Sequence, residues 1–240
     1  MDTVEVVARP KPMNTRMGDE PDVAAIDHPL VNESRALLER LGRRELTVEA
    51  YQAEVVRLHD RLDLPRLLRP YVEMALAGET PILYRRTFPG GREAIQLFAI
   101  AAGEVHPPHA HHNIVSTQMV VSGLIRCREY DRVARLGPDT VLLRRRFDGW
   151  METGQSMHTT ELERNVHWFA ADEAPAVVLN FSAYGYQDWT FDPKDRPLRR
   201  GLIDPTAGTT PDGYLVGREV GPDVAYTKFA GVPIDAFVEP

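Results

Sequence analysis

The 240-residue sequence contains one cysteine and no long hydrophobic run, and both shortages exclude whole classes of protein. Cys127 alone cannot form an internal disulfide, which excludes a small secreted scaffold held together by disulfides. No apolar stretch approaches the roughly 18 to 20 residues that a helix needs to cross a bilayer, and no charged-then-apolar leader opens the chain. We therefore expect a cytoplasmic protein without a membrane partner.

Clustered positive charge is also scarce. The formal net charge is −7, and the one dense basic run is Arg144-Arg145-Arg146. Nucleic-acid binding depends on many clustered Lys and Arg side chains that displace counterions from phosphates, so we expect no nucleic-acid partner. A length of 240 residues with 43% hydrophobic and 26% charged residues is typical of one globular domain with a smaller appendage.

The N-terminal third of the chain changes from irregular to helical patterns. Residues 1–25 mix proline, glycine and scattered charges without lasting periodicity, which predicts a flexible arm. Residues 26–79 repeat apolar side chains at helical spacing and predict a helical cap on the following domain. Three helices are expected, with these boundary residues: Asn32 or Ser34 capping the first, Thr47 capping the second, Pro65 in the first turn of the third and Gly78 at its end.

Residues 80–240 show the pattern of a β-rich domain. Short apolar or alternating runs are separated by Gly, Pro and Asp, and they predict these strands: 82–84, 94–101, 115–121, 124–130, 141–145, 166–169 and 176–182. Seven such runs favour a sandwich or a barrel. Ser122-Gly123 predicts a tight hairpin turn, because glycine adopts positive φ without steric cost. Beyond Trp189 we expect an irregular tail.

Three histidines have the spacing of a metal site. His109 and His111 are two residues apart, so on a strand both side chains point to the same side, whereas His112 is expected to face outward. His167, in an apolar run far downstream, is the third candidate ligand. Neutral imidazole binds iron, zinc, copper and nickel, and three such donors leave positions open for a substrate. The spacing of the acidic residues Glu152, Glu161 and Glu163 does not mark them as ligands.

The same histidines lie in segments that resemble the two cupin motifs. Gly103, His109, His111 and Gly123 follow the layout of the first motif, with Ser116 where its glutamate normally stands. The segment 165–169 and the run 173–179 that follows it resemble the second motif. The resemblance implies a mainly β fold: a cupin (double-stranded β-helix, jelly-roll) barrel, here with an N-terminal helical cap.

A cupin with three histidines and no acidic ligand resembles the thiol dioxygenases, the group that contains cysteine dioxygenase. Tyr84-Arg85-Arg86-Thr87 is similar to a segment of that family in which the arginine pairs with the substrate carboxylate, which implies site roles for Tyr84 and Arg86. The segment 174–182 is similar to a second segment of that family. Asn180 and Ser182, however, stand where the family has a His and a Tyr near the metal. His158, between the two motifs, is a candidate proton donor at the barrel mouth.

The expected function is therefore that of a non-haem Fe(II) cupin oxygenase, an oxidoreductase that acts with O2 on a small anionic substrate. The resemblance points to a thiol as substrate. Two alternatives stay open: an O2-independent lyase, isomerase or epimerase that uses Zn, Mn or Ni, and a non-catalytic cupin that binds a small ligand. The sequence leaves a homodimer open as well.

Overall fold

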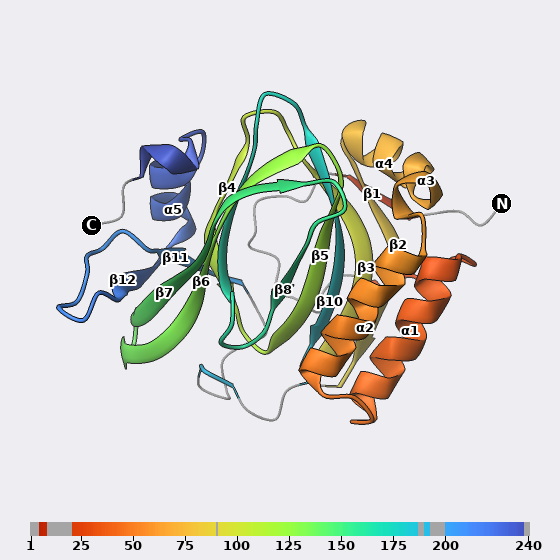
Figure 1. The fold of residues 1–240 in the computed structure, drawn as a ribbon, viewed down its shortest axis with the longest axis horizontal. Coiled ribbons are helices and arrows are strands. Elements are labelled where there is room, and N and C mark those ends of the chain that lie inside the picture. Colours follow the sequence, from red (N-terminus) through yellow and green to blue (C-terminus); the bar gives the residue numbers. More distant parts are fainter. Residues whose placement is uncertain (1–4, 9–20, 90, 187–189, 193–199, 238–240) are drawn as a thin grey trace.

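The computed structural model describes residues 5–8, 21–89, 91–186, 190–192 and 200–237. Two antiparallel β-sheets face each other, and helices lie on both outer sides (Figure 1). Strands that follow one another in the chain pass repeatedly from one sheet to the other, which is the arrangement of a jelly roll. The predicted fold class, a mainly β cupin-type barrel with helices at its N-terminal side, is confirmed.

One sheet, here called the helix-covered sheet, has six strands. In spatial order they are β1 (Glu5–Ala8), β2 (Glu79–Phe88), β3 (Gly91–Ile100), β10 (Ala176–Tyr184), β5 (Ile114–Ser122) and β8 (Ser156–Thr159). The other, here called the closed sheet, contains in order β11 (Arg200–Asp204), β12 (Leu215–Val220), β7 (Thr140–Glu152), β6 (Leu124–Gly137), β9 (Val166–Ala171) and β4 (Val105–His111). It closes because β11 pairs with β4 as well as with β12.

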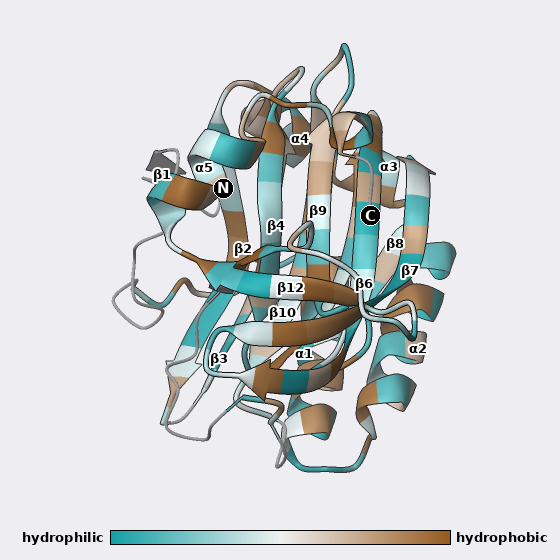
Figure 2. Cartoon of the chain, turned by 90° about the vertical axis from the view of Figure 1, so that its left-hand side faces the viewer, coloured by the Kyte–Doolittle hydropathy of each residue, from teal (hydrophilic) through white to brown (hydrophobic). Residues whose placement is uncertain are grey.

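The helices α1 (Pro29–Gly42), α2 (Val48–Arg61), α3 (Leu64–Leu67) and α4 (Arg69–Leu76) pack on the outer face of the helix-covered sheet. Apolar and polar residues alternate along the helices and strands (Figure 2). The apolar helix faces meet every second residue of the strands, such as Ile95, Leu179 and Phe181. Among the described residues, no helix combines the length and apolar character needed to span a bilayer.

Some predicted helix boundaries were wrong. The first helix begins at Pro29 after His28, whose Nδ1 accepts from the Leu30 N–H, so Asn32 and Ser34 lie inside it. Thr47 caps the second helix as predicted. The third predicted helix is in fact two helices, α3 and α4. A second proline, Pro70, starts a new helix shortly after the one that begins near Pro65.

The two ends of the chain are more ordered than their composition suggested. Within the predicted arm, β1 pairs with β2, and Val23 exchanges backbone hydrogen bonds with Arg85; residues 1–4 and 9–20 lie outside the described residues. The predicted irregular tail contains β11, β12 and the helix α5 (Pro222–Phe229). The two strands belong to the closed sheet, and α5 packs on its outer face, where Phe229 lies edge-on against Trp168.

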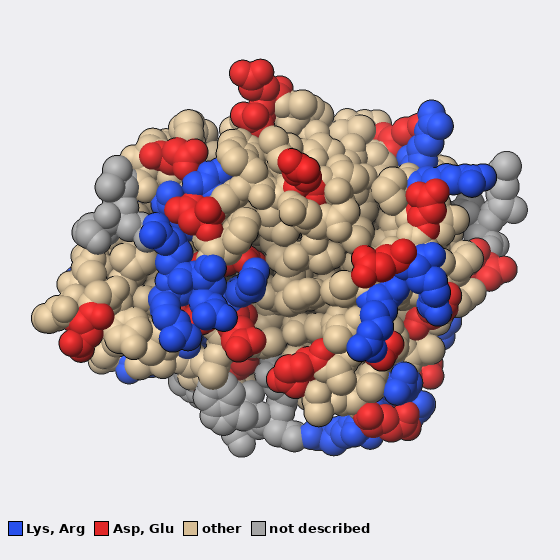
Figure 3. Space-filling view, viewed as in Figure 1, with Lys and Arg blue, Asp and Glu red and all other residues tan. Residues whose placement is uncertain are grey.

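The basic run at 144–146 lies beside acidic side chains. Arg144 and Arg146 lie 2.9 and 3.3 Å from a carboxylate oxygen of Asp131. Arg145 lies 3.4 Å from Asp148. The face in Figure 3 accordingly mixes acidic and basic side chains. Asp131 and Asp148 thus offset part of the positive charge of the run.

Gly123 offers a test of the predicted hairpin between β5 and β6. Its φ is 84°, and an added Cβ would lie 2.8 Å from the carbonyl oxygen of Pro175 and 2.9 Å from the Cα of Ala176. Gly154 has a similar φ of 94°, but open space surrounds its Cβ direction. We expect Gly123→Ala to lower Tm by roughly 4 °C or more beyond the effect of Gly154→Ala, measured by thermal unfolding. Equal shifts for the two variants would contradict the close packing at Gly123.

Candidate metal centre

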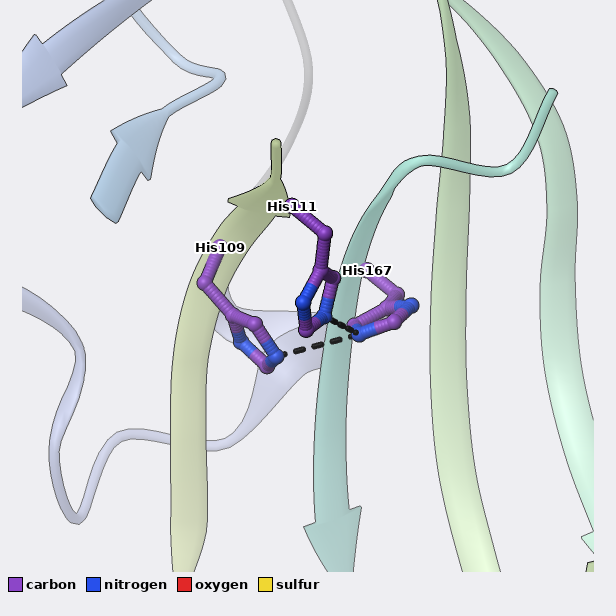
Figure 4. Close-up of side chains that lie close together, drawn as sticks. All are labelled: His109, His111 and His167. Carbon is purple, nitrogen blue, oxygen red and sulfur yellow. Dashed lines mark hydrogen bonds between the residues drawn. The ribbon is translucent and has the colours of Figure 1, made fainter. Parts of the chain in front are cut away.

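Three imidazoles converge between the two sheets (Figure 4). The Nε2 atom of His167 lies 2.9 Å from Nε2 of His111 and 3.0 Å from Nε2 of His109. All three side chains are at most 3% exposed. The structure thus brings together the three histidines that the sequence proposed as metal ligands.

Strand pairing explains why these residues meet. β4 and β9 are antiparallel neighbours, and His109 is the register partner of His167. His111 follows on the same face of β4, two residues along. The Asn165 side chain fixes the end of β4, because its Oδ1 accepts from the His111 N–H and its Nδ2 donates to the His111 carbonyl.

The second ring nitrogens orient two of the imidazoles. His109 Nδ1 lies 2.9 Å from the Pro107 carbonyl oxygen, an acceptor, which places the proton on Nδ1 and leaves the Nε2 lone pair available. His167 Nδ1 lies 3.4 Å from Thr159 Oγ1. Phe169 stacks on the His167 ring at a centroid distance of 4.6 Å. The Nε2 atoms therefore point into the space between the sheets.

The donor set fits a divalent cation. A single proton on His167 Nε2 could serve only one of its two close nitrogen neighbours, whereas a cation would be bound by all three lone pairs. Two nitrogens that each lie about 2.1 Å from a metal are about 3.0 Å apart when the nitrogen–metal–nitrogen angle is a right angle. At the tetrahedral angle they are about 3.4 Å apart. The separations of 2.9 and 3.0 Å match nitrogens of His111 and His109 that each stand at a right angle to that of His167 around a six-coordinate ion.

Glu129 is a neighbour of the triad that the sequence reading missed. It lies on β6 as the register partner of His167 and is fully buried. Arg164 Nη1 donates to its Oε2 at 2.7 Å, whereas its Oε1 has no hydrogen-bond partner. Burial raises the pKa of the Glu129 carboxyl to about 7, against the opposing effect of Arg164. The alternation Ile125, Cys127, Glu129 along the strand was the available signal.

The predicted catalytic residues Tyr84 and Arg86 lie elsewhere. Both side chains are on the helix-facing side of β2, where the Tyr84 hydroxyl donates to Glu93 and Arg86 Nη1 lies 3.9 Å from the same carboxylate. Tyr186 donates to the other oxygen of Glu93 at 2.7 Å. The helix-covered sheet therefore stands between this cluster and the three histidines. The Arg86 side chain is 53% exposed.

His158 is also separated from the triad by strand alternation. On β8, Thr159 points to His167, so its neighbour His158 points to the helix side, where its Nδ1 lies 3.4 Å from Thr117 Oγ1. Burial lowers the pKa of His158 below its usual value. The structure does not bring Tyr84, Arg86 or His158 to the histidine triad.

A second buried cluster corrects the prediction that His112 faces outward. His112 Nδ1 lies 3.4 Å from Asp192 and 3.8 Å from Glu161, and all three side chains are buried. Their spacing alone could hold a metal ion. However, Arg132 lies 2.8 Å from Asp192 and 3.2 Å from Glu161, and Arg135 also contacts Asp192. These guanidinium groups already supply the positive charge, so we interpret the cluster as an ion-pair network.

Comparisons with known proteins give only partial structural likenesses at low sequence identity. No protein-family model and no curated protein matches the sequence. Among solved structures, procruciferin, an 11S globulin from Brassica napus, matches 47% of this chain and 22% of its own at 12% identity (TM-score 0.31). An L-ribose isomerase from Acinetobacter matches 38% of this chain and 48% of its own, at 18% identity and a TM-score of 0.29. A Klebsiella pneumoniae protein with a double-stranded β-helix domain matches 39% of this chain and 64% of its own, at 15% identity and a TM-score of 0.29. This chain thus spans less than two thirds of the length of each of these three proteins.

Metal analysis tests the centre. We expect the purified protein to bind one divalent ion per chain and His109→Ala to bind none, because two imidazoles hold a divalent ion much less tightly than three. Glu161→Gln, in the second cluster, should keep one equivalent. Metal content is measured by mass spectrometry, with near-ultraviolet circular dichroism to verify folding. A folded His109→Ala protein that retains its metal would remove the triad as the site.

Proposed function

We propose that the protein is a mononuclear non-haem iron(II) oxygenase that acts on a small molecule, with His109, His111 and His167 as the metal ligands. The convergence of their three Nε2 atoms at 2.9 and 3.0 Å is the observation that supports this proposal. Three neutral ligands leave the full charge of a divalent ion and three adjacent open positions, which suits a substrate with an ionisable donor together with O2. Bound iron(II) would supply the redox chemistry that activates O2.

The remaining residues of the centre would orient the ligands and exclude water. Thr159 and the carbonyl of Pro107 hold the outer nitrogens of two imidazoles. Phe169 and Cys127 belong to an apolar layer on one side of the triad. Glu129 would accept the proton that a thiol or an enol releases on binding the metal, since its buried carboxyl is in register with His167 on the same face of the closed sheet.

A thiol remains the substrate that the sequence resemblance suggests, but Arg86 does not support it from its present position. The proposal therefore requires only an ionisable S–H or O–H group that can reach the metal. Any carboxylate on the substrate would have to find a partner other than Arg86, whose neighbour is Glu93.

A second candidate is an O2-independent isomerase or lyase, and Glu129 is the observation that favours it. A buried carboxyl in register with a candidate metal ligand, one oxygen of which has no partner among the described residues, is suited to abstracting a proton next to a carbonyl bound at the metal. In that case zinc or manganese would serve as well as iron.

Oxygen uptake separates the two functions. We expect the iron(II)-loaded protein to consume O2 with at least one member of a panel of thiols and enolisable hydroxycarbonyl compounds, and His111→Ala to consume none above background. An oxygen electrode with product analysis measures this. Proton exchange into substrate without O2 uptake, abolished in Glu129→Gln, would favour the isomerase or lyase instead.

A further inference from the structure

The space between the sheets has an apolar layer followed by a polar layer. In the apolar layer, Val120 and Val178 of the helix-covered sheet meet Cys127 and Phe169 of the closed sheet. Side chains two residues further along each strand share the same face. On the closed sheet these are Glu129 and His167; on the helix-covered sheet they are Gln118 and Asn180.

The strand register places the polar pair of the closed sheet, Glu129 and His167, at about the same distance along the barrel as the polar pair of the helix-covered sheet, Gln118 and Asn180. β9 leads through a short turn into β10, so moving from Phe169 to His167 and from Val178 to Asn180 leads away from the same end of the barrel. An independent contact places His167 within one row of this level. Thr159 is the register partner of Ser116, and its Oγ1 lies 3.4 Å from His167 Nδ1.

Three amide side chains form a row across adjacent strands. Asn180 on the central strand β10 is the register partner of Gln96 on β3 and of Gln118 on β5. One row further, Ser182 is paired with Ser116. The two rows opposite the histidines therefore carry neutral amides and hydroxyls, whereas Arg85 and Arg92 lie at the edge of the same face, at the register positions of Ala94 and Tyr184.

This polar face has hydrogen-bonding groups without partners. Asn180 and Gln118 are each 3% exposed and Ser116 is 1% exposed, yet Asn180 Oδ1, Gln118 Oε1 and Ser116 Oγ make no hydrogen bond with the residues that the structure describes. Buried polar atoms are almost always paired, because an unpaired one is destabilising. Three unpaired groups that share one face beside a metal centre indicate a place that a ligand occupies.

The chemistry of this face selects the ligand. Carboxylate recognition normally uses an arginine, and none stands in the amide row itself. Arg86 lies on the other side of the sheet, Arg164 is held by Glu129, and Arg85 donates to the carbonyl of Pro21. An amide both donates and accepts, and a hydroxyl group is its natural complement because it does the same. Uncharged hydroxyl groups on neighbouring carbons could bind neighbouring amides of the row.

We infer that Gln118 and Asn180 are specificity residues that bind the hydroxyl groups of a neutral, polyhydroxylated substrate, such as a small sugar or hydroxycarbonyl compound, opposite the metal. The inference rests on the proposed function, since the histidine triad would bind the reacting end of the same molecule.

Isosteric apolar variants test this inference. Gln118→Met and Asn180→Leu keep the shape of the side chain and remove its hydrogen bonds. We expect both to raise the Kd for dihydroxyacetone, erythrose or ribose by roughly tenfold or more, since each hydroxyl loses its partner. Titration calorimetry of the iron(II)-loaded protein under argon measures Kd. Metal content should stay at the wild-type value.

Thermal stability distinguishes a binding role from a structural one. Because the amide oxygens have no protein partner, replacing them with apolar groups should leave Tm unchanged or raise it, while ligand binding weakens. Thr117→Val is the matched control. Thr117 is fully buried on the same strand but faces the helices, so this variant should bind the sugars like the wild type.

Two outcomes would overturn the inference. One is that none of the three hydroxyl compounds binds saturably while a charged thiol such as 3-mercaptopropionate does. The other is that Gln118→Met and Asn180→Leu bind the sugars as tightly as Thr117→Val does. Both leave the proposed function intact if metal binding and O2 uptake persist. Conversely, sugar binding that depends on the amides in a protein that binds no metal would overturn only the proposed function.

Discussion

The pairing of β4 with β9 is the constraint on which the candidate centre depends. This pairing sets His109 opposite His167. His111, two residues further along β4, lies on the same face and also reaches the His167 ring. A shift of one residue in either strand would turn every imidazole of that strand to the other face of the sheet. The Asn165 side chain and the packing of Trp168 against Phe229 act on the two faces of this strand pair and oppose such a shift.

A polar layer inside a barrel is tolerated because apolar packing surrounds it. The helices α1–α4 bury the outer face of the helix-covered sheet, and α5 packs on the outer face of the closed sheet. A further apolar cluster fills one end of the space between the sheets. These cores supply the hydrophobic stabilisation, so the polar layer can retain unpaired groups that are destabilising by themselves.

Local patterns predicted what depends on neighbouring residues in the chain. The HxH spacing placed His109 and His111 on one face, and the glycine at 123 marked the hairpin. The face on which Tyr84 and Arg86 lie could not be predicted, because a register shift between Ile82 and Tyr84 changes how β2 pairs with β3. The role of His112 depends on Arg132 and Asp192, which are distant in sequence. Proline and glycine in the C-terminal region obscured two short strands.

The charges around the centre decide what kind of substrate could enter it. Glu129 and Arg164 neutralise each other, and the histidines are neutral when they bind a metal, so a divalent ion would leave a local charge of about +2. That charge acts on the atoms that reach the metal and favours their ionisation. The amide row faces the rest of the substrate and carries no charge. A molecule with one acidic S–H or O–H group and an otherwise neutral, hydroxylated body satisfies both conditions, whereas a substrate with an additional carboxylate would lose hydration without gaining a cationic partner from this row.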